Sequence, residues 1–144
     1  MYLVVSNTDS SSYYSDNKAS HFFVKLGKPL DLSGCWKIAL CEVTILGNTA
    51  KRGTVGLTCN ICNGLWVEGV QTRLLRKFKC EKNNHLVFPV PYYVAIEKLF
   101  IDTLEFHILT NKGKEVSLTP DVKVELTLHL IHDEDLRTGC EWLD

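Results

Sequence analysis

The segment from Asn17 to Glu42 constrains the fold most, because its pattern is that of two β-strands joined by a turn. Its first run repeats an apolar residue at every second position, which places Phe22, Val24 and Leu26 on one face of a strand. Lys28-Pro29 then interrupts the ladder, since proline has no N–H to donate, and a Ser33-Gly34 turn follows. After that turn the alternation resumes with Trp36, Ile38 and Leu40. The segment holds no catalytic motif and predicts two strands of a β-sheet protein.

Short alternating runs continue along the whole chain. We predict strands at residues 2–6, 21–26, 35–46, 54–61, 65–70, 72–79, 86–89, 93–96, 103–109, 114–118 and 122–132. Residues 70–79 also fit a helix, with Val70, Leu74, Leu75 and Phe78 on one face. Many short strands separated by turns predict a β-sandwich or a barrel.

Three turn signals separate the predicted strands. Asn63-Gly64 predicts a two-residue hairpin between residues 59–62 and 65–67. Asn111-Lys112-Gly113 predicts a second hairpin, and Thr119-Pro120-Asp121 a turn before the last run. That run is apolar at Val122, Val124, Leu126, Leu128 and Leu130. Its other face is polar, which predicts a sheet with one wet side.

Both ends of the chain carry turn and core residues that resemble one protein family. The N-terminal residues are Tyr2-Leu3-Val4-Val5, Ser6-Asn7, Tyr14, Asn17, Phe22, Leu26, Pro29-Leu30, Leu32, Gly34, Trp36, Ile38, Ala39-Leu40 and Glu42. The C-terminal residues are Asp102, Leu104, Phe106, Ile108, Gly113, Val116, Val122, Val124, Leu126 and Leu128-His129. Together they resemble the penton or minor capsid proteins of Polinton (Maverick) elements, adintoviruses and adomaviruses. The resemblance does not extend over the middle, residues 47–100.

This resemblance implies an all-β fold, a single jelly-roll β-sandwich of two antiparallel sheets over residues 1–132, with a C-terminal tail at 133–144. It implies a viral structural protein, a penton-type minor capsid protein that forms homopentamers at the five-fold vertices of an icosahedral capsid. The implied partners are other copies of the chain and a double jelly-roll major capsid protein, and the implied location is the virion. The alternative from another class is a β-sandwich ligand- or glycan-binding module without catalytic activity.

Composition and charge fit one globular domain. The 144 residues are 45% hydrophobic and 23% charged, with a formal net charge of −1. This balance gives no whole-molecule attraction to nucleic acid, which disfavours a nucleic-acid contact. No apolar run is long enough to span a bilayer, and the N-terminus has no signal-peptide pattern, so we expect synthesis in the host cytosol.

Six cysteines raise the question of disulfides or metal: Cys35, Cys41, Cys59, Cys62, Cys80 and Cys140. For a cytosolic chain we favour reduced, partly buried thiols. Cys59 and Cys62 form half of a zinc-site spacing, with Cys80 and His85 as loosely spaced further candidates. If residues 54–62 are one strand, Cys59 and Cys62 point to opposite faces, which argues against a shared metal.

We predict no enzyme. The five histidines include no pair at an offset of two, as a cupin-type metal site needs, and His129 and His132 are three apart. Paired catalytic carboxylates could come from Glu105 with Asp102, or from residues 133–135. A solvated strand edge and a polar tail explain these residues better. The chain has no phosphate-binding loop and no Gly-x-Ser-x-Gly motif. We therefore assign no catalytic, cofactor-binding or metal-binding residue and expect no cofactor.

Three segments are candidates for contacts with other molecules. Tyr13 and Tyr14 lie in a polar loop and are candidate inter-subunit contacts, as are Trp142 and Leu143 in the tail, which would act as an inter-subunit arm. A candidate basic contact patch is formed by Arg73, Arg76, Lys77 and Lys79. It is either a solvated face or a contact to a neighbouring capsid protein or to nucleic acid.

Overall fold

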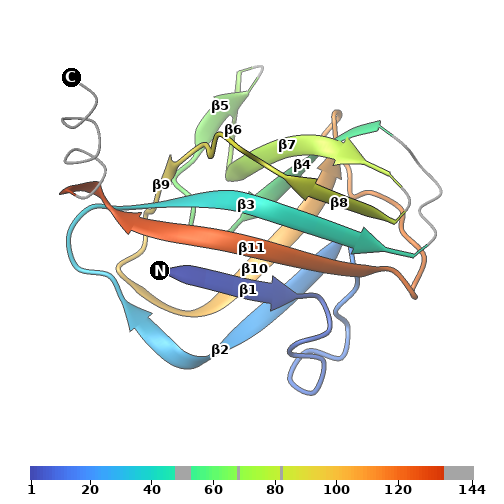
Figure 1. Ribbon diagram of the computed structural model, residues 1–144, viewed down its shortest axis with the longest axis horizontal. Helices are drawn as coiled ribbons and strands as arrows, with labels where there is room; N and C mark the ends of the chain where they lie inside the picture. Colours follow the sequence, from blue (N-terminus) through green and yellow to red (C-terminus); the bar gives the residue numbers. More distant parts are fainter. Residues whose placement is uncertain (48–52, 68, 82, 135–144) are drawn as a thin grey trace.

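The computed structural model describes residues 1–47, 53–67, 69–81 and 83–134, which form an all-β molecule (Figure 1). The strands are β1 (Tyr2–Ser6), β2 (His21–Asp31), β3 (Trp36–Leu46), β4 (Gly53–Cys59), β5 (Leu65–Val67), β6 (Val70–Thr72), β7 (Leu74–Cys80), β8 (Asn84–Val87), β9 (Val94–Ala95), β10 (Phe100–Thr110) and β11 (Lys123–His132). The described residues include no helix that is long and apolar enough to cross a membrane.

The strands form two antiparallel sheets that pack face to face (Figure 1). The first sheet has the order β1-β11-β3-β8, with β9 also paired to β3, and the second has the order β2-β10-β4-β7. The first strand therefore pairs with the last, β2 with β10, β3 with β8 and β9, and β4 with β7. This nested pairing is that of one long hairpin, with the small β5-β6 hairpin at its tip. The long hairpin is rolled up so that β11 also pairs with β3, and β10 with β4, which makes a single jelly roll.

The core lies between the sheets and follows the alternation seen in the sequence. Phe22 and Val24 of β2 are buried, as are all five apolar positions from Val122 to Leu130. Phe22 packs against Phe106 of β10, with ring centroids 5.3 Å apart. The buried residues form one cluster that extends from Val5 to Leu130, so one core serves both sheets.

Two β-bulges change which residues face the core. In β3 the register shifts beside Cys41, so the inward positions change from Ile38 and Leu40 to Val43 and Ile45. In β7 the register shifts at Leu75, so Leu75 and Phe78 are both buried although they are three residues apart. The helix alternative for residues 70–79 is therefore wrong, because a bulged strand produces the same spacing of apolar residues.

The interruption predicted at Lys28-Pro29 is present, although β2 continues to Asp31. Leu30 pairs with Ile101 and Lys25 with Thr103, so residues 26–29 bulge out of the ladder opposite Asp102. Gly34, at the following turn, has φ +88, and a Cβ there would lie 2.6 Å from Nε2 of His132. The positive φ is the reason for glycine at this turn, because the His132 imidazole is the end of a side chain that can rotate away from a Cβ.

One predicted hairpin is wrong, and another forms only in part. Asn63-Gly64 does not form a hairpin with β4, because both edges of β4 are already paired with β10 and β7, while β5 pairs with β6. The predicted strand at 114–118 is absent. The predicted turn at Asn111-Lys112-Gly113 is present: Thr110 N donates to Lys114 O (2.7 Å), Val116 N donates to Ile108 O (3.0 Å), and a bridge joins Leu109 to Glu115 between them, but no strand is formed. The turn at Thr119-Pro120-Asp121 is confirmed by a hydrogen bond from Val122 N to Thr119 O of 3.1 Å.

Candidate functional site

The polar loop between β1 and β2 is held by side chains that bind the backbone of β2. Oδ1 of Asn17 accepts a hydrogen bond from Phe23 N (2.9 Å), and its Nδ2 donates to Phe23 O (2.8 Å). Ser10 Oγ accepts a hydrogen bond from Lys25 N (2.8 Å). Side-chain oxygens and amides of this kind replace the backbone partners that a loop lacks.

The two loop tyrosines have different surroundings. Tyr14 is half-buried and stacks on Phe23, with ring centroids 5.1 Å apart, whereas Tyr13 is 69% exposed. Both line a pocket of about 250 Å³ with Ser15, Asp16, Asn17, His21 and Phe23. Tyr14 is therefore packed onto the second sheet, and Tyr13 is the tyrosine that is available for contact.

The predicted basic patch is divided in the structure, because its two arginines bind groups of the same chain. Arg73 forms an ion pair with Glu97 and donates hydrogen bonds to Asn60 O (3.3 Å) and Cys62 O (2.9 Å). The Arg76 guanidinium lies over the rings of Phe88 (4.0 Å) and Tyr92 (4.2 Å).

The two lysines of the patch, Lys77 and Lys79, point outward from β7 and are exposed. Neither has an ion-pair partner in the part of the chain that the structure describes. Only two of the four predicted residues thus present free charge.

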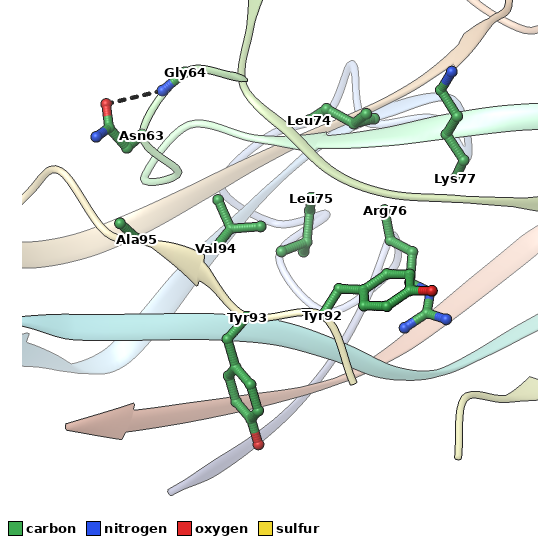
Figure 2. A pocket seen from close by; sticks show the side chains of 10 residues that line it. All are labelled: Asn63, Gly64, Leu74, Leu75, Arg76, Lys77, Tyr92, Tyr93, Val94 and Ala95. Carbon is green, nitrogen blue, oxygen red and sulfur yellow. Dashed lines mark hydrogen bonds between the residues drawn. The ribbon is translucent and has the colours of Figure 1, made fainter. Parts of the chain in front are cut away.

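A groove lies between β7 and the segment that leads into β9 (Figure 2). Its volume is about 540 Å³. Figure 2 shows Tyr92 beside the Arg76 guanidinium, while the Tyr93 side chain points away from the other lining residues. The lining residues are Asn63, Gly64, Leu74, Leu75, Arg76, Lys77, Tyr92, Tyr93, Val94 and Ala95. The groove forms here because β7 and β9 are edges of different sheets.

Tyr93 joins a second aromatic group on the outer face of the first sheet. Its hydroxyl lies 2.9 Å from Nδ1 of His129, and the His129 ring stacks on Tyr2 at 4.4 Å. Burial, followed by the nearby N-terminal ammonium group, lowers the pKa of His129. Burial also raises the pKa of Tyr93.

The structure brings Cys59 and Cys62 together, so the prediction that they point to opposite faces is wrong. β4 ends at Cys59, and a turn closed by a Cys62 N to Cys59 O hydrogen bond of 3.1 Å returns Cys62 to the core. A hydrogen bond with the Cys59 thiol, together with burial, raises the pKa of the Cys62 thiol. Cys35, Cys41 and Cys80 are also free thiols, and Cys140 lies outside the described residues.

A cluster of His21, Glu105 and His107 was not predicted from the sequence. The three side chains meet on the outer face of the second sheet, and their ligand atoms lie within 4.8 Å of one another. The Glu105-x-His107 spacing already places two of them on one face of a strand, but His21 becomes a neighbour only through the β2–β10 register. By contrast, His132 packs edge-on against Trp36, apart from His129.

The predicted tail contacts, Trp142 and Leu143, lie outside the described residues. Comparison of the chain with protein-family models, with curated proteins and with solved structures found no significant match.

Proposed function

We propose that this protein is a viral structural protein, a penton-type minor capsid protein that forms homopentamers at the five-fold vertices of an icosahedral shell. The observation that carries the proposal is the nested jelly-roll pairing of β1 with β11, β2 with β10, β3 with β8 and β4 with β7. This pairing is the architecture that the sequence resemblance implies, and capsid subunits are among the proteins built on it.

The residues that carry the resemblance support the same proposal through their structural roles. Gly34 occupies a turn that requires a positive φ, and Trp36 Nε1 donates a hydrogen bond to Ser33 O (2.9 Å) across that turn. Phe22 and Phe106 pack against each other in the core. The motif residues thus specify the shape of the domain, which suits a protein whose function is assembly.

A closed five-fold ring requires two unlike patches on each subunit, because its contacts are head-to-tail. The sandwich has two unlike sides, one with the edge strands β1 and β2 and the other with β7 and β8 (Figure 1). Exposed apolar residues occur on both sides: Tyr2 and Val4 on the first, and Val87, Val90 and Tyr92 on the second. We infer that the second side, with its groove, receives the first side of the neighbouring subunit.

The experiment that tests the proposal is the solution mass of the purified protein by light scattering under reducing conditions. A closed pentamer gives about five times the chain mass of 16.3 kDa. Should the mass be that of a monomer, the measurement is repeated with the co-expressed double jelly-roll major capsid protein. A monomer in both samples contradicts the proposal.

A second candidate function is a ligand- or glycan-binding module, which the pocket beside the tyrosine loop favours. Tyr14 and Phe23 supply an aromatic surface there, and Asp16 and Asn17 supply polar groups next to it. This candidate predicts a monomer that binds glycans on an array and loses that binding in Tyr13→Ala. The capsid proposal predicts no such binding from the isolated domain.

A further inference from the structure

Two histidines and a glutamate direct their ligand-type atoms to one point on the outer face of the second sheet. Nε2 of His21 lies 2.8 Å from Oε2 of Glu105, and Nε2 of His107 lies 3.3 Å from the same oxygen. The two imidazole rings are stacked, with centroids 3.8 Å apart. We propose that His21, Glu105 and His107 bind a divalent transition-metal ion, with Zn²⁺ as the reference ion. This inference does not depend on the proposed capsid function.

The backbone holds these three side chains in place before any metal binds. Glu105 and His107 are two residues apart on β10, between the buried residues Leu104, Phe106 and Ile108, so both point outward. His107 pairs directly with His21 of β2. On its other edge β10 pairs with β4, so His107 and Glu105 lie on a central strand of the sheet. Ligands on paired strands are fixed more precisely than ligands on loops.

The two distances from the Glu105 carboxylate to the histidine nitrogens are close to those of a zinc site. With zinc–ligand bonds of about 2.0–2.1 Å, tetrahedral geometry separates the ligand atoms by about 3.3 Å. The Glu105–His107 distance of 3.3 Å already has this value. The His21–Glu105 distance of 2.8 Å must lengthen by about 0.5 Å. Because the stacked imidazole rings are only 18° from parallel, one of them must also turn so that both nitrogens point at one ion.

The donor set selects the class of metal. Two imidazole nitrogens with one carboxylate suit Zn²⁺, Co²⁺, Ni²⁺ or Cu²⁺, whereas Ca²⁺ and Mg²⁺ prefer oxygen ligands alone. Three protein ligands leave a coordination position open for water or for a small ligand. The side chains of His21, Glu105 and His107 are 32%, 29% and 35% exposed, so solvent reaches the site. Since His21 also lines the pocket beside Tyr13 and Tyr14, a molecule on the open position would lie next to that pocket.

The buried thiol pair is the competing metal-binding group. Cys59 and Cys62 are 1% and 0% exposed, and the structure adds no third ligand to them among the residues it describes. Among the described residues, His21, Glu105 and His107 are the only group of three His, Cys, Asp or Glu side chains that could hold a metal ion. A test must therefore separate binding through imidazole from binding through thiolate.

The experiment titrates the metal-free, reduced full-length chain with ZnCl₂ by calorimetry and with CoCl₂ by absorption spectroscopy. We expect one ion per chain and a Co²⁺ spectrum without a thiolate-to-metal charge-transfer band. His107→Ala and Glu105→Gln should each weaken Zn²⁺ binding by at least about 10-fold, since each removes or weakens a direct ligand. Saturating Zn²⁺ should also raise the Tm of the unsubstituted protein by roughly 5 °C, and this rise should vanish in both variants.

Two control variants complete the design. His85→Ala removes a histidine that is paired with a glutamate, Glu42, at 3.4 Å but lies outside the cluster, and it should leave Zn²⁺ binding unchanged. The Cys59→Ser/Cys62→Ser double variant should also retain binding. Circular dichroism and urea midpoints in EDTA verify that each variant is folded. The proposal is overturned if the chain binds no Zn²⁺ stoichiometrically, if His107→Ala and Glu105→Gln bind Zn²⁺ as tightly as the parent, or if only the cysteine variant loses the ion.

Discussion

The two regions flanking the sandwich are stabilised by different kinds of contact. The loop between β1 and β2 is fixed by hydrogen bonds to backbone: Asn7 Oδ1 accepts from Val124 N (2.9 Å), and its Nδ2 donates to Val122 O (3.2 Å). The groove between β7 and β9 is spanned by a side-chain stack, in which Arg76 lies over Phe88 and Tyr92. The polar side chains of the first region are satisfied by backbone groups of the same subunit, while the second region leaves apolar surface that another molecule can cover.

This comparison has a consequence for mutations. Changes in the loop should reduce the stability of the single subunit, because they leave buried polar groups without partners. Changes at the exposed groove residues, such as Tyr92, should have small effects on stability and larger effects on assembly, because these side chains are already exposed to water in the free subunit.

The largest effect is expected for Asn7→Ala. Asn7 is 7% exposed, and its removal leaves the N–H of Val124 and the C=O of Val122 without these partners. The free energy of unfolding should fall by about 2–4 kcal/mol, measured by urea denaturation. Ser12→Ala, at an exposed residue of the same loop, is the matched control and should change stability by less than about 0.5 kcal/mol. Equal effects of the two variants would show that the loop is not held by Asn7.

A smaller effect is expected for Arg76→Ala. This change removes the guanidinium from both rings and its hydrogen bond to Val90 O (2.9 Å). The expected loss is about 1–2 kcal/mol in the same urea assay. Lys77→Ala, at the neighbouring exposed position on β7, should change stability by less than about 0.5 kcal/mol. If the two variants lose the same free energy of unfolding in urea, the stack of Arg76 on Phe88 and Tyr92 does not stabilise the groove.

Tyr92→Ala should separate assembly from stability. Tyr92 is 61% exposed, so its truncation should cost the subunit less than about 1 kcal/mol. In the proposed ring it fills the contact between subunits, so the light-scattering mass should fall from that of the pentamer toward that of the monomer. Leu99→Ala, which is 62% exposed and outside the groove, should leave the mass unchanged. If the Tyr92→Ala protein has the same light-scattering mass as the parent, the groove is not part of the interface between subunits.

The smallest effect is a change in the pH dependence of stability at His129. Its folded-state pKa is lowered by burial and then by the N-terminal ammonium, so below the ordinary pKa of about 6.5 the unfolded chain binds more protons. The contribution of His129 to stability is therefore present above pH of about 6.5 and is lost as the pH falls toward the folded pKa. His129→Gln should flatten this part of the curve, measured by urea midpoints across that range. An unchanged slope would exclude His129 as its source.

Much of the fold could be predicted from the sequence because strand alternation is a local property. Phe22 and Val24 are buried, as is every second residue from Val122 to Leu130, as the apolar pattern predicts. The bulges at Cys41 and Leu75 could not be predicted, since an extra residue reverses the alternation only when a partner strand is present. The hairpin predicted at Asn63-Gly64 fails for a similar reason. A favourable turn sequence forms no hairpin with β4, because both edges of β4 are already paired.

The candidate sites depended on the tertiary structure still more strongly. The charges of Arg73 and Arg76 were visible in the sequence, but their use in an ion pair with Glu97 and in a stack on two aromatic rings was not. Glu105 and His107 share a strand face by their spacing alone. His21 lies 84 positions from Glu105 and joins it only through the register of β2 and β10.

The strand pattern of the sequence therefore determined that this protein is an all-β sandwich or barrel with a core made from alternating apolar residues, and the resemblance favoured the sandwich. The sequence also determined the turns at Gly34 and Gly113, where a positive φ favours glycine. Only the tertiary structure decided which strands pair, which side chains meet on the outer faces, and where apolar surface stays uncovered. The physical reason is that side-chain alternation is set by neighbouring residues, whereas pairing and register result from competition among all strands for the same edges.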